Sequence, residues 1–120
     1  MYQILVLDYD EYCFGKVYSD GEIKHISDQS FVPKKHRKGG QSAKRYSMNR
    51  ENSIVQWFKK INEMLKPIKG EIYLGISQIY YKRFCKYLST DNYNKIIHNQ
   101  SIEYSNLTGI YQYVNSLQNN

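Results

Sequence analysis

The sequence predicts one α/β (α+β) domain in which helices flank a mixed β-sheet, and three observations support this prediction. The 120 residues are enough for one domain with a core and too few for two ordinary domains. Strand patterns joined by turn signals fill the N-terminal part, and helix and strand patterns alternate in the C-terminal part. A long segment with helical apolar spacing separates the two parts. We therefore expect residues 1–120 to form a single domain.

The N-terminal part is expected to be rich in hairpins. The predicted strands are Tyr2–Leu7, Tyr12–Tyr18, Glu22–Ser27 and a short Gln29–Val32. The first is apolar enough for a central strand. Asp20 and Gly21 are a two-residue hairpin signal between the second and third strands. Pro33 ends the last strand because it has no backbone N–H to donate to a neighbour.

The long helix is expected to begin near Ser42, a residue type that suits an N-cap. Its buried face is predicted to contain Ile54, Phe58, Ile61 and Leu65, widened by Trp57 and Met64. The early part, Ala43–Arg50, is polar and basic, so we expect it to project past the body of the domain. Pro67 and Gly70 are the stop signals.

The C-terminal part is expected to add strands and helices to the same domain. The predicted elements are a strand Glu71–Ile76, a helix Ile79–Leu88, two weaker strands Lys95–His98 and Ser101–Tyr104, and a helix Leu107–Leu117. Gly75 indicates a close approach of two parts of the backbone. Phe84 and Leu88 are expected to face inward.

Composition and charge favour a nucleic-acid partner. The net charge is +6, and seven of the 17 Lys and Arg residues lie between Pro33 and Arg50, where there is no acid. Such a cluster is typical of phosphate binding. No apolar run is long enough to cross a membrane, and the N-terminus lacks the pattern of a signal peptide, so we expect a cytoplasmic protein. Cys13 and Cys85 fit no metal or redox spacing and are expected to be reduced core thiols.

The most specific pattern is the run from 33 to 46, which reads Pro-Lys-Lys-His, Arg-Lys, Gly-Gly-Gln-Ser-Ala, Lys, Arg-Tyr. This run resembles the GGQ loop of the class I peptide chain release factors of eukaryotes and archaea. Those factors carry Pro-Lys-Lys-His, two residues, Gly-Gly-Gln-Ser-Ala, one residue, Arg and an aromatic residue. Every family position is filled here. Beyond the loop, the order of elements resembles the middle, catalytic domain of such a factor, with the basic loop protruding ahead of the long helix.

The resemblance implies hydrolysis of the ester that joins a nascent peptide to its tRNA. Gly39, Gly40 and Gln41 are then the catalytic residues. The backbone N–H of Gln41 stabilises developing charge, its side chain positions water, and the glycines permit the necessary conformation. The reaction needs no metal, no cofactor and no nucleophilic serine.

The same resemblance names the partners, which are peptidyl-tRNA and the ribosomal RNA of the peptidyl transferase centre. The expected RNA-binding residues are Lys34, Lys35, His36, Arg37, Lys38, Lys44 and Arg45. The cations would hold phosphates without reading sequence. His36 is interpreted as an RNA contact rather than as a general base.

One acidic group has two interpretations. Asp8, Asp10 and Glu11 directly follow the first strand, where a polar turn is expected. Three nearby carboxylates are also what a metal-dependent nuclease would use. We favour the turn.

A complete factor of this class also has a codon-reading domain and a domain for its partner GTPase, and these 120 residues provide neither. One interpretation is a stand-alone hydrolase that rescues stalled ribosomes without codon choice, with recognition left to a separate partner. Met1 directly before a strand and the short C-terminal tail favour it. Another is the catalytic fragment of a longer termination factor. The rival from a different class is a basic RNA-binding module without catalysis, and the retained Gly39-Gly40-Gln41 favours hydrolysis.

Overall fold

The computed structural model describes residues 1–32, 41–102 and 104–118. The elements in chain order are β1 (Tyr2–Leu7), β2 (Glu11–Val17), β3 (Ile23–Gln29), α1 (Gln41–Leu65), β4 (Ile72–Gly75), α2 (Gln78–Cys85), α3 (Thr90–Lys95), β5 (Ile96–Gln100) and α4 (Leu107–Gln118). They form one α+β domain with a mixed sheet, which confirms the predicted fold class.

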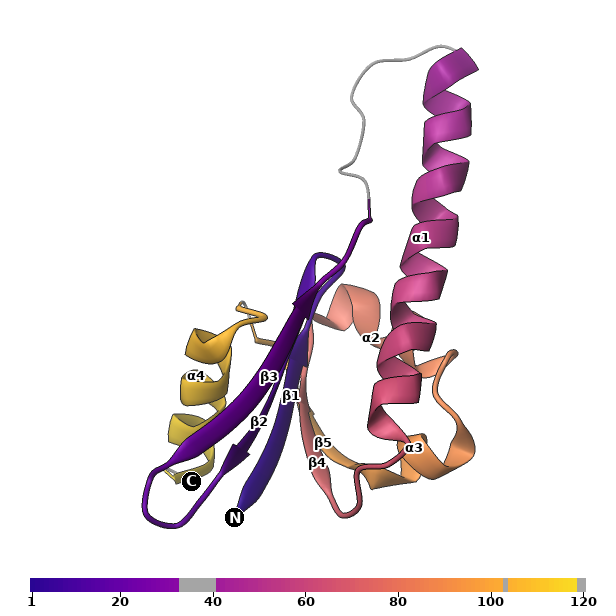
Figure 1. Ribbon diagram of the computed structural model, residues 1–120. Helices are drawn as coiled ribbons and strands as arrows, with labels where there is room; N and C mark the ends of the chain where they lie inside the picture. The colour runs from indigo at the N-terminus through magenta and orange to yellow at the C-terminus, as the bar shows by residue number, and fades with distance from the viewer. Residues whose placement is uncertain (33–40, 103, 119–120) are drawn as a thin grey trace.

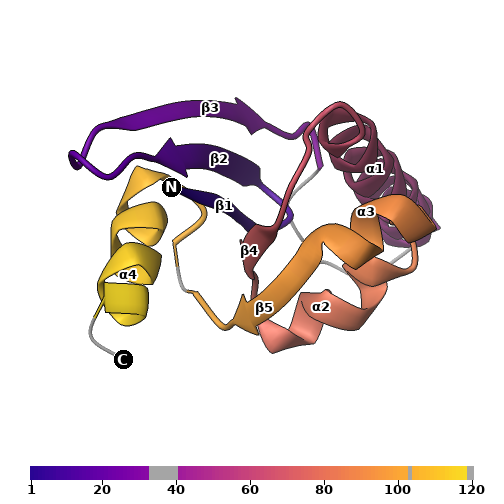
Figure 2. The same cartoon turned by 90° about the horizontal axis from the view of Figure 1, so that it is seen from below.

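The sheet has five strands in the order β3-β2-β1-β4-β5. β1 and β2 are antiparallel, as are β2 and β3, whereas β4 runs parallel to both β1 and β5. Helix α4 covers one face of the sheet, and helices α1, α2 and α3 cover the other (Figures 1 and 2). β1 is therefore the central strand, as predicted.

The two faces of β1 belong to two separate apolar clusters. Leu5 and Leu7 pack with the buried face of α1, and Ile4 and Val6 pack against α4. A strand covered on both faces is apolar without interruption, because neither set of alternating side chains meets water. This burial explains the unbroken run that marked the strand in the sequence.

Helix α1 has 25 residues and is therefore about 37 Å long. The predicted core residues Ile54, Phe58, Ile61 and Leu65 are all fully buried, and Trp57 is nearly so. The N-terminal part of α1 extends beyond the end of the sheet (Figure 1), which confirms the predicted projection. The helix begins at Gln41, so Ser42 lies in its first turn and is not the N-cap that we expected.

The chain before the basic segment leaves the sheet earlier than predicted. Gln29 is the last residue of β3, and the expected fourth strand Gln29–Val32 does not form. The reason is a pair of hydrogen bonds from Ser30. Its N–H donates to the carbonyl of Asp10 at 2.8 Å and its hydroxyl donates to the carbonyl of Tyr9 at 2.5 Å. These bonds hold residue 30 against the β1–β2 turn.

The hairpin between β2 and β3 is confirmed, with a loop one residue longer than predicted. Tyr18 donates its N–H to the carbonyl of Glu22 at 2.9 Å, so three residues form the loop. Gly21 has a φ of 90°, which is the left-handed residue that this loop length requires.

The C-terminal part departs from the prediction in three places. Helix α2 ends at Cys85, so Leu88 packs on the core from outside the helix. The short helix α3 was not predicted, because Thr90–Lys95 has no apolar periodicity and depends on the Ser89 cap. The second weak strand is wrong, since Ser101, Ile102 and Tyr104 lie in no strand.

Two smaller predictions, on Gly75 and on the cysteines, are confirmed only in part. An added Cβ at Gly75 would lie 2.7 Å from Cγ1 of Ile102 and 3.0 Å from Cγ1 of Val6, so the space at this glycine is filled by two side chains and not by the second part of the backbone that we expected. Cys13 and Cys85 are both free thiols, but the predicted core position holds for Cys13 alone, since Cys85 is half-buried. Burial raises the pKa of Cys13 to about 11. Among the described residues, no helix is both long and apolar enough to span a membrane.

Gly109 in α4 gives a test of the packing between α4 and the loop before it. A Cβ at this position would lie 1.9 Å from the backbone carbonyl oxygen of Tyr104. Gly→Ala in a helix normally stabilises by about 1 kcal/mol, but here the backbone would have to move. We expect Gly109→Ala to lower the free energy of unfolding by about 2 kcal/mol or more, measured by urea denaturation. The neighbouring exposed Thr108→Ala should leave stability nearly unchanged, and equal stability of both variants would contradict the packing.

Candidate active site

The predicted site residues fall into two groups in the structure. Gln41 is the first residue of α1, and Lys44 and Arg45 follow in its first two turns. The remaining predicted site residues lie outside the described residues, and they are Lys34, Lys35, His36, Arg37, Lys38, Gly39 and Gly40. The structure therefore describes the part of the domain that holds both ends of the segment 33–40. We call this part the platform.

Tyr9, in the β1–β2 turn, contacts the chain on both sides of this segment. On the leaving side, its carbonyl accepts the hydroxyl of Ser30 at 2.5 Å. On the returning side, the guanidinium of Arg50 lies 5.4 Å from the centre of the Tyr9 ring, which is within the range of a cation–π contact. One residue thus ties together two positions that are twenty residues apart in the sequence.

Helix α2 completes the support of Tyr9. The ring of Tyr80 stacks on the Tyr9 ring with 4.1 Å between centroids. Arg83 lies 5.8 Å from the same ring centre and donates to the Tyr9 hydroxyl at 3.3 Å. Arg83 also forms an ion pair with Glu51 of α1. These contacts fix α1 at the level where it leaves the body of the domain.

The turn that carries Tyr9 is held by the side chain of Asp8. One carboxylate oxygen accepts the N–H groups of Asp10 and Glu11 at 2.7 and 3.0 Å. The other accepts the hydroxyl of the buried Ser105 at 2.9 Å. The indole N–H of Trp57 donates to the backbone carbonyl of Asp8 at 2.9 Å, which adds a direct bond from α1 to the turn.

These bonds decide the role of the acidic group Asp8, Asp10 and Glu11 in favour of a turn. Both oxygens of Asp8 have hydrogen-bond donors from the protein, and Ser105 also lies 3.1 Å from a carboxylate oxygen of Glu11. A carboxylate that is already satisfied stabilises a loop. The predicted turn is confirmed.

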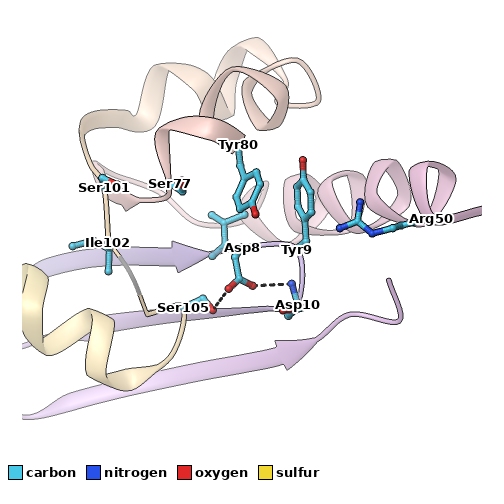
Figure 3. Close-up of a pocket in the computed structure, with 10 residues that line it drawn as sticks. Asp8, Tyr9, Asp10, Arg50, Ser77, Tyr80, Ser101, Ile102 and Ser105 are labelled. Carbon is cyan, nitrogen blue, oxygen red and sulfur yellow. Dashed lines mark hydrogen bonds between the residues drawn. The ribbon is translucent and has the colours of Figure 1, made fainter. Parts of the chain in front are cut away.

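A cavity of about 380 Å³ lies beside this turn, at the carboxyl ends of β1 and β4. Figure 3 shows the rings of Tyr9 and Tyr80 side by side on one wall, with Arg50 beyond them and the Asp8–Ser105 hydrogen bond on another wall. Ser105 on its wall donates to Asp8 from a distant part of the chain, and Tyr9, Tyr80 and Arg50 make the aromatic and cation–π contacts described above. The cavity therefore belongs to the support of α1.

Sequence reasoning missed the supporting residues Tyr9, Tyr80 and Arg83, which come from two elements far apart in the chain. The sequence did contain a signal that Glu51 could form an ion pair. This residue is the first acid after the basic segment, and an acid at that point of a basic helix is suited to pair with a cation of the body.

Comparison with known proteins agrees with this architecture. Residues 1–119 match the protein family described as eRF1 domain 2. The chain belongs to the eRF1 domain 2 family. This membership confirms the resemblance that the segment 33–46 indicated.

A curated relative covers nearly the same part of the chain. The peptide chain release factor subunit 1 of Archaeoglobus fulgidus is 31% identical over 127 aligned residues, which include 95% of this chain and 30% of the relative. The chain therefore spans about a third of the length of this relative. The match extends through the sheet and helices, well beyond the loop on which the resemblance was first based.

The role of Tyr9 in this eRF1 domain 2 chain can be tested by stability. Tyr9→Leu removes the Tyr80 stack and the contacts with Arg50 and Arg83, so the free energy of unfolding should fall by about 1.5–3 kcal/mol. Tyr9→Phe keeps the ring and loses only one hydrogen bond at 3.3 Å, so it should cost under about 1 kcal/mol. Urea denaturation measures both. An equal loss for the two variants would mean that the ring contacts contribute nothing.

Proposed function

We propose that this chain hydrolyses the ester of peptidyl-tRNA on the ribosome and releases the nascent peptide without reading a codon. The observation that carries the proposal is the complete run from 33 to 46, with Gly39-Gly40-Gln41 at its centre. This run stands in a chain that belongs to the eRF1 domain 2 family. The curated relative is a peptide chain release factor subunit, which supports a role in translation termination.

The position of Gln41 supports a direct part in the chemistry. It is the first residue of α1, and the first N–H groups of a helix have no acceptor within the helix. They carry the positive end of the helix dipole. A backbone N–H placed there is suited to stabilise negative charge on the reacting ester, and one such donor is worth about 3–4 kcal/mol of barrier. In this mechanism Gly39 and Gly40 let the backbone approach the ester, and the side chain of Gln41 orients the attacking water.

The charge pattern supports the ribosome as the place of reaction. Seven cations lie between residues 33 and 50 and no acid does. The N-terminal part of α1 extends beyond the sheet (Figure 1), so Lys44 and Arg45 lie on the projecting part of the molecule. Ribosomal RNA and tRNA present dense phosphates, which such cations neutralise without reading bases. Lys34, Lys35, His36, Arg37 and Lys38 are proposed to act in the same way.

Codon independence is proposed for the 120-residue chain acting by itself. Within the described ranges, all elements belong to the one sheet and its covering helices. The proposal therefore assigns the chain to rescue of stalled ribosomes in the cytoplasm, with any recognition supplied by a separate partner.

The variant Gly40→Ala tests the catalytic assignment. The added Cβ obstructs the backbone conformation of the tip, whereas the cations that hold RNA remain. We expect peptide release from ribosomes carrying peptidyl-tRNA to fall by about 100-fold or more, which corresponds to the loss of one aligned donor. Binding to ribosomes, measured by co-sedimentation, should be nearly that of the wild type. Release at the wild-type rate would overturn the assignment.

A second variant serves as the control, because it should weaken ribosome binding, which Gly40→Ala should leave nearly unchanged. Replacing Lys34, Lys35, Arg37 and Lys38 together by Ala should weaken ribosome binding and lower the slope of log K against log salt by about 0.7–0.9 per lost phosphate contact. An RNA-binding module without catalysis would show this loss of binding together with no release by the wild type.

A further inference from the structure

A groove lies between the end of β3 and α1. We call it the Phe31 groove, and its walls include Phe31, Asn52, Gln56, Trp57 and Lys60. Its volume is about 280 Å³, just below the roughly 300–1,000 Å³ of pockets that enclose whole drug-sized ligands. A single planar ring system fits such a space better than a long peptide does.

Phe31 is the most unusual residue of this groove because its side chain is 95% exposed. An exposed apolar side chain is ordinary when it stands alone. This ring, however, borders a groove whose opposite wall includes Trp57, and Trp57 is held in place by its hydrogen bond to Asp8. Phe31 therefore offers an open aromatic face next to a fixed surface.

The α1 side of the groove presents a row of polar groups. Asn52, Gln56 and Lys60 are spaced four residues apart, so they lie along one face of the helix. The amides of Asn52 and Gln56 have no hydrogen-bond partner within the part of the chain that the structure describes. Lys60 pairs with Asp28 of β3 at 2.5 Å. No acidic residue is among the described residues that line the groove.

The residues of the groove are also next to the basic segment in the sequence. Phe31 comes two residues before Pro33, and Asn52 comes two residues after Arg50. The two walls are thus the residues that immediately precede and follow the seven cations. The groove residues are therefore the neighbours, along the chain, of residues suited to bind phosphates.

We propose that the Phe31 groove binds one unstacked base of single-stranded RNA. The base stacks on the ring of Phe31, and the amides of Asn52 and Gln56 donate and accept hydrogen bonds at its edge. Aromatic stacking and amide pairing with splayed-out bases are the usual means by which proteins bind single-stranded RNA. The proposal deepens the proposed function, on which it rests, because it adds a base contact to an interface otherwise made of phosphate contacts.

The test uses the purified chain and a fluorescently labelled single-stranded oligouridylate, with binding measured by anisotropy. Trp57 is the one tryptophan in the sequence, so quenching of its emission reports a base in the groove. Phe31→Ala should weaken binding by about 5- to 150-fold, the range for loss of one base–aromatic stack. Phe31→Tyr should stay within about twofold of the wild type, since the aromatic face is kept. An RNA duplex of the same length should not quench Trp57.

Two further variants decide between a base and an apolar protein side chain. Phe31→Leu keeps an apolar group without an aromatic face, so it should bind as weakly as Phe31→Ala. Ile79→Ala removes an apolar side chain that is 83% exposed on α2 and should bind like the wild type. Binding restored by Leu, an equal loss with Ile79→Ala, or no quenching by single-stranded RNA would each overturn the proposal. None of these results depends on ester hydrolysis, so the release assay with Gly40→Ala tests the proposed function separately.

Discussion

The β1–β2 turn is the constraint on which the rest of this structure depends. Asp8 closes the turn by accepting two backbone N–H groups, and it joins the turn to the segment before α4 through Ser105. Tyr9 then holds Ser30 on one side and Arg50 on the other. A short turn at the end of the central strand thus sets where the basic segment leaves the domain and where it returns.

These contacts support helix α1, which projects from the body of the domain. Most helical stability in proteins comes from packing of an apolar face. The C-terminal half of α1 has that packing through Ile54, Phe58, Ile61 and Leu65. The aromatic and ionic contacts of Tyr9, Arg50 and Arg83 extend the support to the last turn before the helix leaves the sheet. The proposed function, in which the tip presents a backbone N–H to the ester, requires such support.

The sequence predicted the elements whose residues follow a regular pattern. β1 is apolar because both of its faces are covered, and α1 repeats apolar residues at helical spacing, so both were placed nearly to the residue. Helix α3 has no such pattern. It is held by polar contacts that no periodicity reveals, since the side chain of the buried Asn92 donates to the backbone carbonyl and the side chain of Asn62 at 2.8 and 2.7 Å. The false strand at Gln29–Val32 has the same origin, because the bonds of Ser30 to the turn are contacts between distant parts of the chain.

The candidate site also has one part that the sequence predicted and one part that it did not. The residues proposed for catalysis and RNA binding are contiguous, so the run from 33 to 46 could be recognised in the sequence, and the family match over residues 1–119 agrees with it. Its supporting residues come from the β1–β2 turn, α1 and α2 and meet only in the folded chain. The Phe31 groove is a similar case, since Phe31 and Asn52 are separated by the whole basic segment.

The central claim is that this chain releases peptides without a codon-reading part. The most direct measurement is the rate of peptide release by the purified 120-residue chain from three ribosome complexes carrying peptidyl-tRNA. The first has a stop codon in the A site, the second a sense codon, and the third no codon. The account predicts release from all three at equal rates. A clear preference for the stop codon, or no release from any complex, would contradict it.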